Sequence, residues 1–298
     1  MGNKREFKDY RNGLLLISPA LIVIFIVIIY PFSRGIWMSF LNLDLMRGGS
    51  GEFIGLTNFR SIIGKRRFWQ VVINTFIWTG FNVVIQMSVG LGIAMLLNSK
   101  IKGRGIFRSV SMIPWVIPSV ASALTWRWIY NYDFGVINAL LNRIGILDKS
   151  IAWLGNVGTA MPSVIFASIW KGLPYVTIML LASLQPISQE LYESADIDGA
   201  STLQKLFYIT LPLIKRTFAI ATILTTIFTV NNFNAIWLMT QGGPLYSTEI
   251  LFTHAYRMAF ISYDFGEASA VAVILFLILS IFGFVYLYLI ERDEKSVN

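Results

Sequence analysis

The chain has 298 residues, of which 55% are hydrophobic and only 13% carry a formal charge. Soluble globular domains carry about 25% charged residues, so this composition excludes an ordinary soluble domain and indicates a membrane protein. The lack of cysteine excludes disulfides, thiolate metal sites and a cysteine nucleophile. The formal charge of +8 does not indicate nucleic-acid binding, because the basic residues flank apolar stretches and form no basic domain.

Taken in chain order, six long apolar stretches predict six transmembrane helices. The first follows a basic segment and is too long for a signal peptide, and no small-residue cleavage site follows it. We expect Pro114 and Pro118 to kink the third span, and Lys171, Gly172 and Pro174 to interrupt the fourth. The predicted fold is an all-α integral membrane protein whose spans are residues 13–33, 68–99, 110–126, 159–184, 217–240 and 265–290.

The positive charges predict the orientation of these spans. The short loop after the second span carries Lys100, Lys102, Arg104 and Arg108 and no acidic residue, which favours a cytoplasmic position. The loop before that span is also basic, so the total bias is small. Orientation therefore depends mainly on the short loop and on the polar segment between spans four and five. We expect cytoplasmic ends at 1–12 and 291–298, and a transmembrane domain over 13–290.

The polar segment over residues 185–216 predicts two short helices with a break between them. Ser188 is a suitable N-cap, and Ser201 followed by Gln204 is the pattern of a capping box. Gly199 lies between the two helices, where a glycine turns the chain most easily. Pro212 is expected to close the second helix. Such an element could dock on a partner without entering lipid, or could simply be a capped loop.

The residues of this segment resemble a known motif. Glu193-Ser-Ala, Asp198-Gly-Ala-Ser and Ile209-x-Leu211-Pro212 are similar to the EAA motif of permease subunits of ATP-binding-cassette importers, with Ser194 where alanine is usual. In that family the loop is the coupling helix, which docks in a groove of a cytoplasmic ATPase. The resemblance therefore implies that ATPase coupling depends on Glu193, Ala195, Asp198, Gly199, Ala200, Ile209, Leu211 and Pro212.

Several kinds of chemistry are disfavoured. The sequence contains no phosphate-binding Gly-x-x-x-x-Gly-Lys-Ser/Thr loop, so ATP and its magnesium ion are expected on a separate subunit. No Asp or Glu falls at mid-membrane depth, with Glu267 at the outer edge of span six, which argues against an ion-coupled secondary carrier. The single histidine, His254, is expected on the surface. We therefore expect no catalytic residue, no metal site and no cofactor in this chain.

Polar residues recur on the faces of three spans. Ser168, Gly172 and Tyr175 share a face of span four at helical spacing, Thr225, Thr229 and Asn232 do so in span five, and Ser119 lies in span three. Hydroxyls, amides and an aromatic ring around a cavity suit a sugar. The same small polar residues are also common in helix packing within membranes, and the residues alone favour this second interpretation.

Further motifs resemble the maltose-type permeases of carbohydrate uptake. These are Trp170-Lys-Gly-x-Pro174, Asn231-Asn-Phe233 and Gly242-Gly-Pro244. The resemblance implies a multi-pass subunit of a bacterial or archaeal cytoplasmic membrane, working with a second permease, an ATPase dimer and an extracytoplasmic sugar-binding protein. It also implies that sugar faces Ser119, Ser168, Lys171, Gly172, Tyr175, Thr225, Thr229 and Asn232. Ser168 and Thr229 replace asparagines and Thr225 replaces a serine, which implies a ligand other than maltose.

Lys171 leaves a further alternative open. It is the one charge well inside a predicted span, and it could meet the carboxylate or phosphate of an acidic sugar. The interpretation we favour is that it snorkels or faces a wet cavity without touching the ligand. A secondary carrier that needs no nucleotide, or a membrane scaffold or sensor, are the alternatives from other functional classes.

Overall fold

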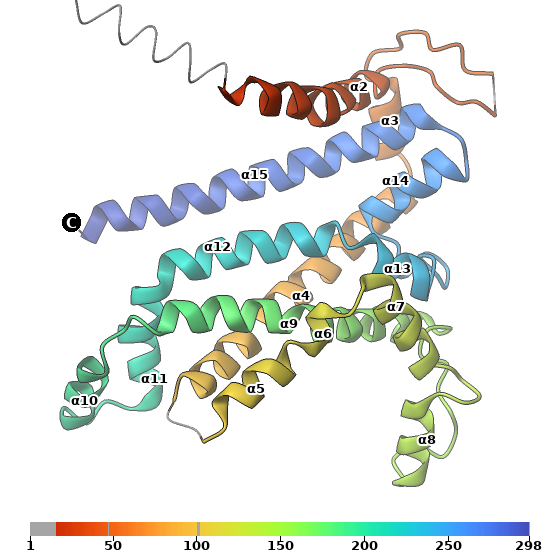
Figure 1. Ribbon diagram of the computed structural model, residues 1–298. Coiled ribbons are helices and arrows are strands. Elements are labelled where there is room, and N and C mark those ends of the chain that lie inside the picture. Colours follow the sequence, from red (N-terminus) through yellow and green to blue (C-terminus); the bar gives the residue numbers. More distant parts are fainter. Residues whose placement is uncertain (1–15, 47, 100–101, 298) are drawn as a thin grey trace, which may run out of the picture. The chain divides into compact units, whose positions relative to one another are not determined.

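The computed structural model describes residues 16–46, 48–99 and 102–297, and in these ranges the chain is nearly all helical (Figure 1). The chain divides into two compact units. The first contains residues up to 65 together with 255–276, and the second contains 66–254 together with 277–298.

Five helices within the described ranges are long and apolar enough to cross a membrane. They are Leu16–Met38, Arg66–Asn98, Val157–Leu184, Thr202–Met239 and Phe265–Ile290. Five of the six predicted spans are therefore confirmed as apolar helices, with bounds that differ by several residues. Leu16–Met38 contains a π-helical turn, η1 (Phe25–Ile29), followed by α2 (Tyr30–Met38). The last span is the first part of α15 (Phe265–Val297).

The third predicted span is not one helix. Residues 110–126 fall in α5 (Arg104–Ser111), α6 (Ile113–Val116) and α7 (Ser119–Ile129), and the direction changes by 91° between Arg104–Val116 and Ser119–Ile129. Ile117 and Pro118 both have extended backbone, with ψ of 131° and 139°. A proline lacks the N–H that a helix needs and disfavours the helical region for the residue before it, so the expected kink becomes a break.

The fourth span, in contrast, is uninterrupted. Helix α9 (Val157–Leu184) continues through Lys171, Gly172 and Pro174, so the predicted interruption is wrong. A proline removes one backbone hydrogen bond, and packing on a neighbouring helix can offset this loss. That neighbour is α4 (Arg66–Asn98), the principal packing partner of α9.

Each of these two helices has a glycine that receives a side chain of the other. A Cβ atom at Gly90 of α4 would lie 2.9 Å from Val176 Cγ1, and one at Gly172 of α9 would lie 2.3 Å from Gln86 Oε1. The helices therefore approach each other closely at two points, four residues apart on α4 and on α9. Buried apolar residues continue this contact toward the end of α9, including Leu180 and Leu184.

The fifth span begins earlier than predicted. A helical run links α11 (Thr202–Lys205), the π-helical turn η2 (Leu206–Thr210) and α12 (Leu211–Val230), and α13 (Phe233–Met239) follows after a break. Pro212 lies in the first turn of α12, so the prediction that it ends the helix is wrong. In the wider π turn the N–H of Leu211 reaches Leu206 O, and this local change accommodates a proline within a helical run.

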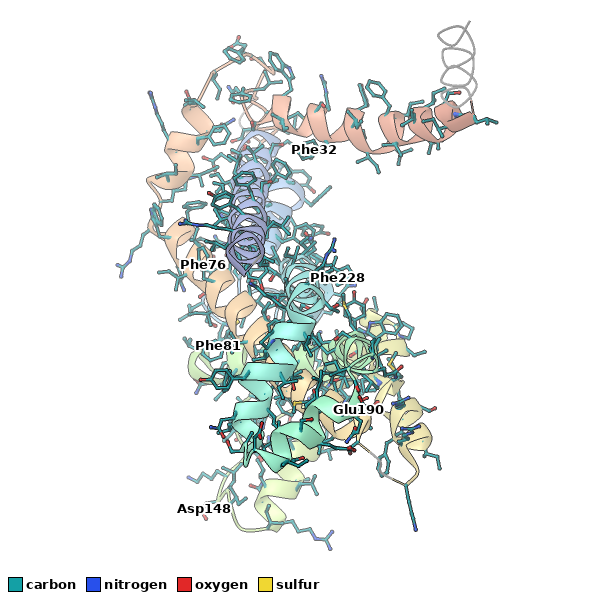
Figure 2. All side chains as sticks on the ribbon, turned by 90° about the vertical axis from the view of Figure 1, so that its left-hand side faces the viewer. Phe32, Phe76, Phe81, Asp148, Glu190 and Phe228 are labelled. Atoms are coloured by element: carbon teal, nitrogen blue, oxygen red, sulfur yellow. The ribbon has the colours of Figure 1, made fainter. Side chains whose placement is uncertain are left out.

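The remaining helices of the second unit are α8 (Val136–Arg143), α10 (Gln189–Ile197) and the start of α14 (Leu251–Phe260). A core of buried side chains joins α4, α7, α9 and α13 around Trp78, Trp126 and Ile236. The outward side of α4 is apolar as well: Phe76 and Phe81 are 62% and 57% exposed and project away from the helix (Figure 2). Exposed aromatic side chains on a long apolar helix suit contact with lipid.

In the first unit the loop after α2 is fixed to the beginning of α15. The side-chain amide of Asn58, on α3 (Thr57–Ile63), donates to the carbonyls of Ser39 and Leu41, each at 2.9 Å. Lys65 Nζ lies 2.6 Å from Oε1 of Glu267, which is in the first turn of α15. Segments about two hundred residues apart in the sequence are thereby joined within one unit.

Candidate functional site

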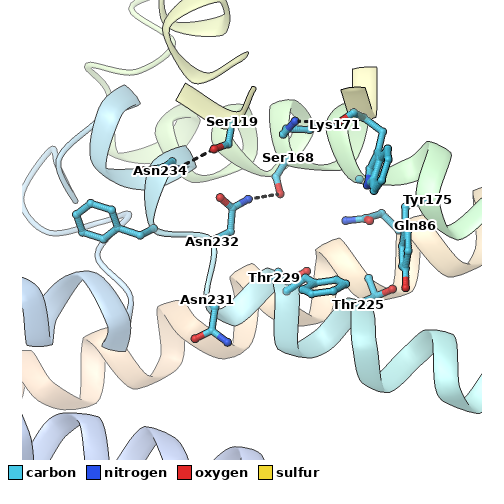
Figure 3. A pocket seen from close by; sticks show the side chains of 14 residues that line it. Gln86, Ser119, Ser168, Lys171, Tyr175, Thr225, Thr229, Asn231, Asn232 and Asn234 are labelled. Atoms are coloured by element: carbon cyan, nitrogen blue, oxygen red, sulfur yellow. Dashed lines mark hydrogen bonds between the residues drawn. The ribbon is translucent and has the colours of Figure 1, made fainter. Parts of the chain in front are cut away.

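One polar pocket lies within the second unit, and it collects the predicted sugar-facing residues (Figure 3). Its volume is about 490 Å³, which is within the range of small-molecule sites. All eight predicted residues line it, although they come from α7, α9, α12 and the turn after α12. The lining consists of Gln86, Trp115, Ser119, Ser168, Lys171, Gly172, Tyr175, Thr225, Phe228, Thr229, Asn231, Asn232, Phe233 and Asn234.

The position of Asn232 differs from the prediction. It does not continue the helical face of Thr225 and Thr229, because α12 ends at Val230 and Asn232 is the N-cap of α13, accepting from the N–H of Ala235 at 3.3 Å. Its side-chain amide is 3.5 Å from the hydroxyl of Ser168 on α9. The break therefore still directs this amide into the pocket.

A second side-chain amide, from the first turn of α13, reaches α7, the helix that begins after the break at Pro118. The side-chain amide of Asn234 donates to Ser119 Oγ at 2.8 Å. Ser119 is the first residue of α7, immediately after the break at Pro118. Two helix breaks therefore meet at the pocket, and hydrogen bonds between short polar side chains connect them (Figure 3).

Lys171 has a defined set of partners. Its Nζ donates to Ile117 O at 2.5 Å and is 3.5 Å from Trp115 O. In an unbroken helix Trp115 O would accept from the N–H of Ser119, and the break frees both carbonyls. The ammonium therefore compensates the broken backbone, and one of its three N–H groups remains for another acceptor.

Aromatic rings form one wall. Trp115 and Tyr175 are stacked, with ring centroids 6.2 Å apart and an angle of 16° between their planes. Phe228 meets Tyr175 edge to face at 5.8 Å. Flat apolar faces beside hydroxyls and amides are suited to a solute that has both CH and OH groups.

Sequence reasoning missed six of the lining residues. Phe233, Asn231 and Asn234 adjoin or belong to the Asn-Asn-Phe motif, from which only Asn232 was selected. The signal for Gln86 was an amide in the middle of a long apolar span. Trp115 and Phe228 carried no signal, because nine tryptophans and 22 phenylalanines are spread along the chain. The six lining residues that the sequence analysis missed are Gln86, Trp115, Phe228, Asn231, Phe233 and Asn234.

The predicted caps in segment 185–216 are confirmed. The Ser188 side chain accepts from Glu190 N–H, Ser201 and Gln204 form the reciprocal capping box, and Gly199 has a φ of +75°. Two further contacts hold the segment together: Lys205 pairs with Asp196 at 2.5 Å, and the hydroxyls of Tyr192 and Thr210 lie 2.9 Å apart. The second contact ties α10 to the π turn that leads into α12.

The other predicted coupling positions fall on the same segment. Its apolar side chains Ile197 and Leu203 are 88% and 66% exposed. Exposed apolar side chains beside a well-capped backbone are typical of a docking element. The residues predicted to couple to an ATPase are distributed over α10 (Glu193 and Ala195), the turn (Asp198, Gly199 and Ala200) and the helical run that follows (Ile209, Leu211 and Pro212).

The prediction for His254 is wrong. It is only 6% exposed, on α14, with Nδ1 3.6 Å from Oε1 of the fully buried Glu249. Glu249 also receives three hydrogen bonds from the Arg67 guanidinium, which stacks on the ring of Tyr246. Burial opposes ionisation of Glu249, but the hydrogen bonds and charges of His254 and Arg67 prevail, so the pKa of this carboxyl lies below its ordinary value.

Within the described ranges, no three His, Cys, Asp or Glu residues are grouped as metal ligands. Several membrane-length helices and a pocket lined by hydroxyls, amides and rings define a polytopic membrane protein with a site for a polar solute. Residues 86–296 match the family described as binding-protein-dependent transport system inner membrane component. The chain belongs to this family, and is thus a multi-pass permease subunit of the ATP-binding-cassette importer class.

Curated relatives match almost the whole chain. The trehalose/maltose transport system permease protein MalF of Thermococcus litoralis is 35% identical over 285 residues, covering 96% of this chain and 95% of that protein. The sulfoquinovosyl glycerol transport system permease protein SmoG of Agrobacterium fabrum is 35% identical over 289 residues, covering 97% and 93%. These relatives are transport permeases.

A solved structure supports the fold. One chain of a bacterial ABC transporter involved in the import of the acidic polysaccharide alginate superposes with a TM-score of 0.83. The two sequences are 23% identical, and the match covers 97% of this chain and 99% of the other. The arrangement of helices described above is therefore that of an importer permease.

Proposed function

We propose that this chain forms half of the translocation pathway of an ATP-driven sugar importer. The observation that carries the proposal is the pocket, which brings together the eight residues expected to face a sugar and adds a stacked pair of aromatic rings. The names of the two curated relatives, for trehalose/maltose and for sulfoquinovosyl glycerol transport, support a sugar or sugar derivative as cargo.

The proposed assembly contains four kinds of subunit. The chain pairs with a second permease, receives sugar from an extracytoplasmic binding protein, and rests on an ATPase dimer that binds ATP and magnesium. Six spans are proposed, with Arg104–Val116 and Ser119–Ile129 together forming the third, and both chain ends lie in the cytoplasm. The exposed apolar residues of α10 and of the run after Gly199 support docking of this segment on the ATPase.

ATP-driven closure of the ATPase would then push on segment 185–216 and move the helices as rigid bodies. The pocket would thereby become accessible from one side of the membrane and then from the other. Glu193 is exposed on α10 and is proposed to pair with a basic group of the ATPase.

The test is purification of the full chain from its native membrane in mild detergent, with identification of the subunits that accompany it. ATPase activity is then measured with candidate binding proteins loaded with neutral or acidic sugars. We expect an ATPase and a second permease to co-purify, and one loaded binding protein to stimulate hydrolysis. If no ATPase co-purifies with the chain under any condition, the proposal is refuted and a carrier that needs no nucleotide is favoured.

A second candidate is an acidic sugar held through Lys171. The observation that favours it is the third N–H of the ammonium, which is left after the bonds to Ile117 O and Trp115 O in a pocket whose lining has no other formal charge. Under this candidate, Lys171→Met raises the half-saturating concentration of an acidic sugar about tenfold or more and leaves that of neutral sugars unchanged. Uptake of the true substrate with unchanged affinity in this variant rejects the acidic-sugar candidate.

A further inference from the structure

We propose that Gln86 determines sugar specificity, and that Gly172 and Asn82 set the position of its amide. The inference rests on the proposed sugar transport and adds a recognising group from α4, a helix that supplies none of the residues expected from sequence. Figure 3 shows the Gln86 side chain reaching from α4 to the pocket beside Tyr175. Its ligand would be a hydroxyl of a sugar, because a side-chain amide can both donate to a hydroxyl and accept from it.

A chain of hydrogen bonds along α4 fixes the orientation of this amide. The Asn82 amide donates to Trp78 O at 2.9 Å, so its carbonyl oxygen faces Gln86 and accepts from Nε2 at 3.2 Å. Trp78 is in turn bound through its indole N–H to Thr229 O at 2.9 Å, beside the break that ends α12. Asn82 and Trp78 are fully buried. The amide of Gln86 is therefore held by groups that solvent does not reach.

The remaining hydrogen-bonding capacity of Gln86 points to a ligand. Gln86 is 4% exposed, and within the described ranges the bond to Asn82 is the one hydrogen bond of its side chain. One N–H and the carbonyl oxygen are left at the edge of the pocket. A sugar hydroxyl that binds both groups would gain hydrogen bonds that the matching deoxy analogue cannot make.

Gly172 determines how far the amide can extend. A Cβ atom at this position would lie 2.3 Å from Gln86 Oε1 and 2.9 Å from its Cδ. The family resemblance implied that the sugar faces Gly172, and in the structure the Gln86 amide lies against this position. A methyl group at residue 172 would displace the end of the glutamine side chain, which is flexible, and would leave the helices in place.

The experiment uses the complete importer in liposomes and measures uptake against concentration. The probes are trehalose, maltose and a panel of neutral and acidic oligosaccharides, each delivered by the binding protein, together with single-deoxy analogues of the best substrate. Gln86→Met keeps the length of the side chain but removes its hydrogen bonds. We expect its half-saturating concentration for the best substrate to rise about tenfold, and discrimination against one deoxy analogue to disappear.

A double-mutant cycle tests the pairing with Gly172. Gly172→Ala should have an effect similar to that of Gln86→Ala, and should add little in the Gln86→Ala background, because the displaced amide is already gone. The matched control is Thr75→Val, which removes two buried hydrogen bonds of α4 away from the pocket, one to Val71 O and one from the N–H of Leu251, and should leave half-saturation and discrimination unchanged.

The outcomes separate the two proposals. If some sugar is transported and Gln86→Met retains wild-type half-saturation and discrimination, the role of Gln86 is refuted while sugar transport stands. If Gly172→Ala impairs uptake equally with and without Gln86, the methyl blocks the pocket directly and the positioning role is refuted. If no oligosaccharide is transported, the sugar proposal itself fails, and the inference about Gln86 fails with it.

Discussion

At the scale of single residues, the strongest electrostatic feature is the buried carboxylate of Glu249. It lies in the segment before α14, whereas its main partner Arg67 is in the first turn of α4, 182 residues away in the sequence. Asn74, also on α4, donates to the backbone carbonyls of Tyr246 and Glu249 at 2.9 Å and 3.1 Å. The cluster therefore holds the segment over residues 242–249 against α4.

Replacing Glu249 with glutamine should lower stability. The substitution removes one partner of a buried pair and leaves the partly exposed Arg67 uncompensated, so we expect a loss of about 2 kcal/mol. The measurement is the thermal unfolding midpoint of the complex in detergent, with Glu52→Gln on an exposed carboxylate as control. Equal midpoints for the two variants would contradict the role of the pair.

The contribution of Glu249 should also depend on pH. Because the pKa of this carboxyl is lowered in the folded protein, its stabilising effect is complete above the ordinary value of about 4.3 and is lost as the pH falls through the lower, folded value. The midpoints of wild type and Glu249→Gln should therefore differ most near neutral pH and converge at acid pH. A difference that grows on acidification would contradict this assignment.

Sequence reasoning identified residues whose role is local and missed those whose role depends on distant partners. Ser188, Ser201 and Gly199 act on backbone within a few residues, so the capping patterns sufficed. His254 was misplaced because its burial depends on packing of α14, which a single polar residue in a loop-like stretch does not reveal. Gln86 was missed because its significance arises from Gly172 on another helix.

At the scale of elements, the structure differs from the prediction mainly where helices break. Apolar length alone predicted six spans, and five of them are confirmed as helices of membrane length, because such a helix needs about 20 apolar residues whatever its neighbours are. The effect of a proline depended on its context. Pro118 interrupts the helix, Pro174 lies within a continuous α9, and Pro212 follows a π turn. Packing against other helices decides among these outcomes, and it is not visible in the local sequence.

The turn between α10 and α11 gives a sharp test at this scale. Gly199 has a φ of +75°, and its Cβ position is open, so Gly199→Val would strain the backbone without a steric clash. We expect ATP hydrolysis to continue while uptake falls at least tenfold, because the segment proposed to dock on the ATPase changes shape. Both are measured in liposomes, after confirming that the variant reaches the membrane.

Gly145→Val is the matched control, since Gly145 has a φ of +73° in an equally open position of the loop after α8. It introduces the same backbone strain outside the proposed coupling segment, and it should leave the ratio of uptake to hydrolysis unchanged. Normal coupling in Gly199→Val, or an equal loss in Gly145→Val, would count against the assignment of the coupling turn.

At the scale of the whole molecule, the orientation of the spans can be tested directly because the chain has no cysteine. Single cysteines at Ser50, Asp148 and Ser262 should react with a membrane-impermeant maleimide in intact cells. Cysteines at Lys102 and Ser201 should react only after the membrane is opened. The cysteine-free parent is the control for background labelling.

The labelling pattern also decides how the broken third segment lies. If Arg104–Val116 and Ser119–Ile129 together cross the membrane, cysteines at Lys102 and Asp148 label from opposite sides. If the bent pair re-enters on the side from which it came, the two positions label from the same side, and the proposal of six spans is wrong. Length and composition of the helices do not distinguish these two arrangements.

The two close contacts between α4 and α9, at Gly172 and at Gly90, have a consequence for how related permeases diverge in sequence. Because a side chain at residue 172 would displace the Gln86 amide, and one at residue 90 would meet Val176, substitutions at these two positions should be coupled to substitutions on the facing helix. Homologous permeases with a side chain at the position of residue 172 should carry a shorter residue at that of residue 86, and likewise for residues 90 and 176. A change of transported sugar that begins with a substitution at residue 86 should therefore be accompanied by a substitution on the facing helix, α9.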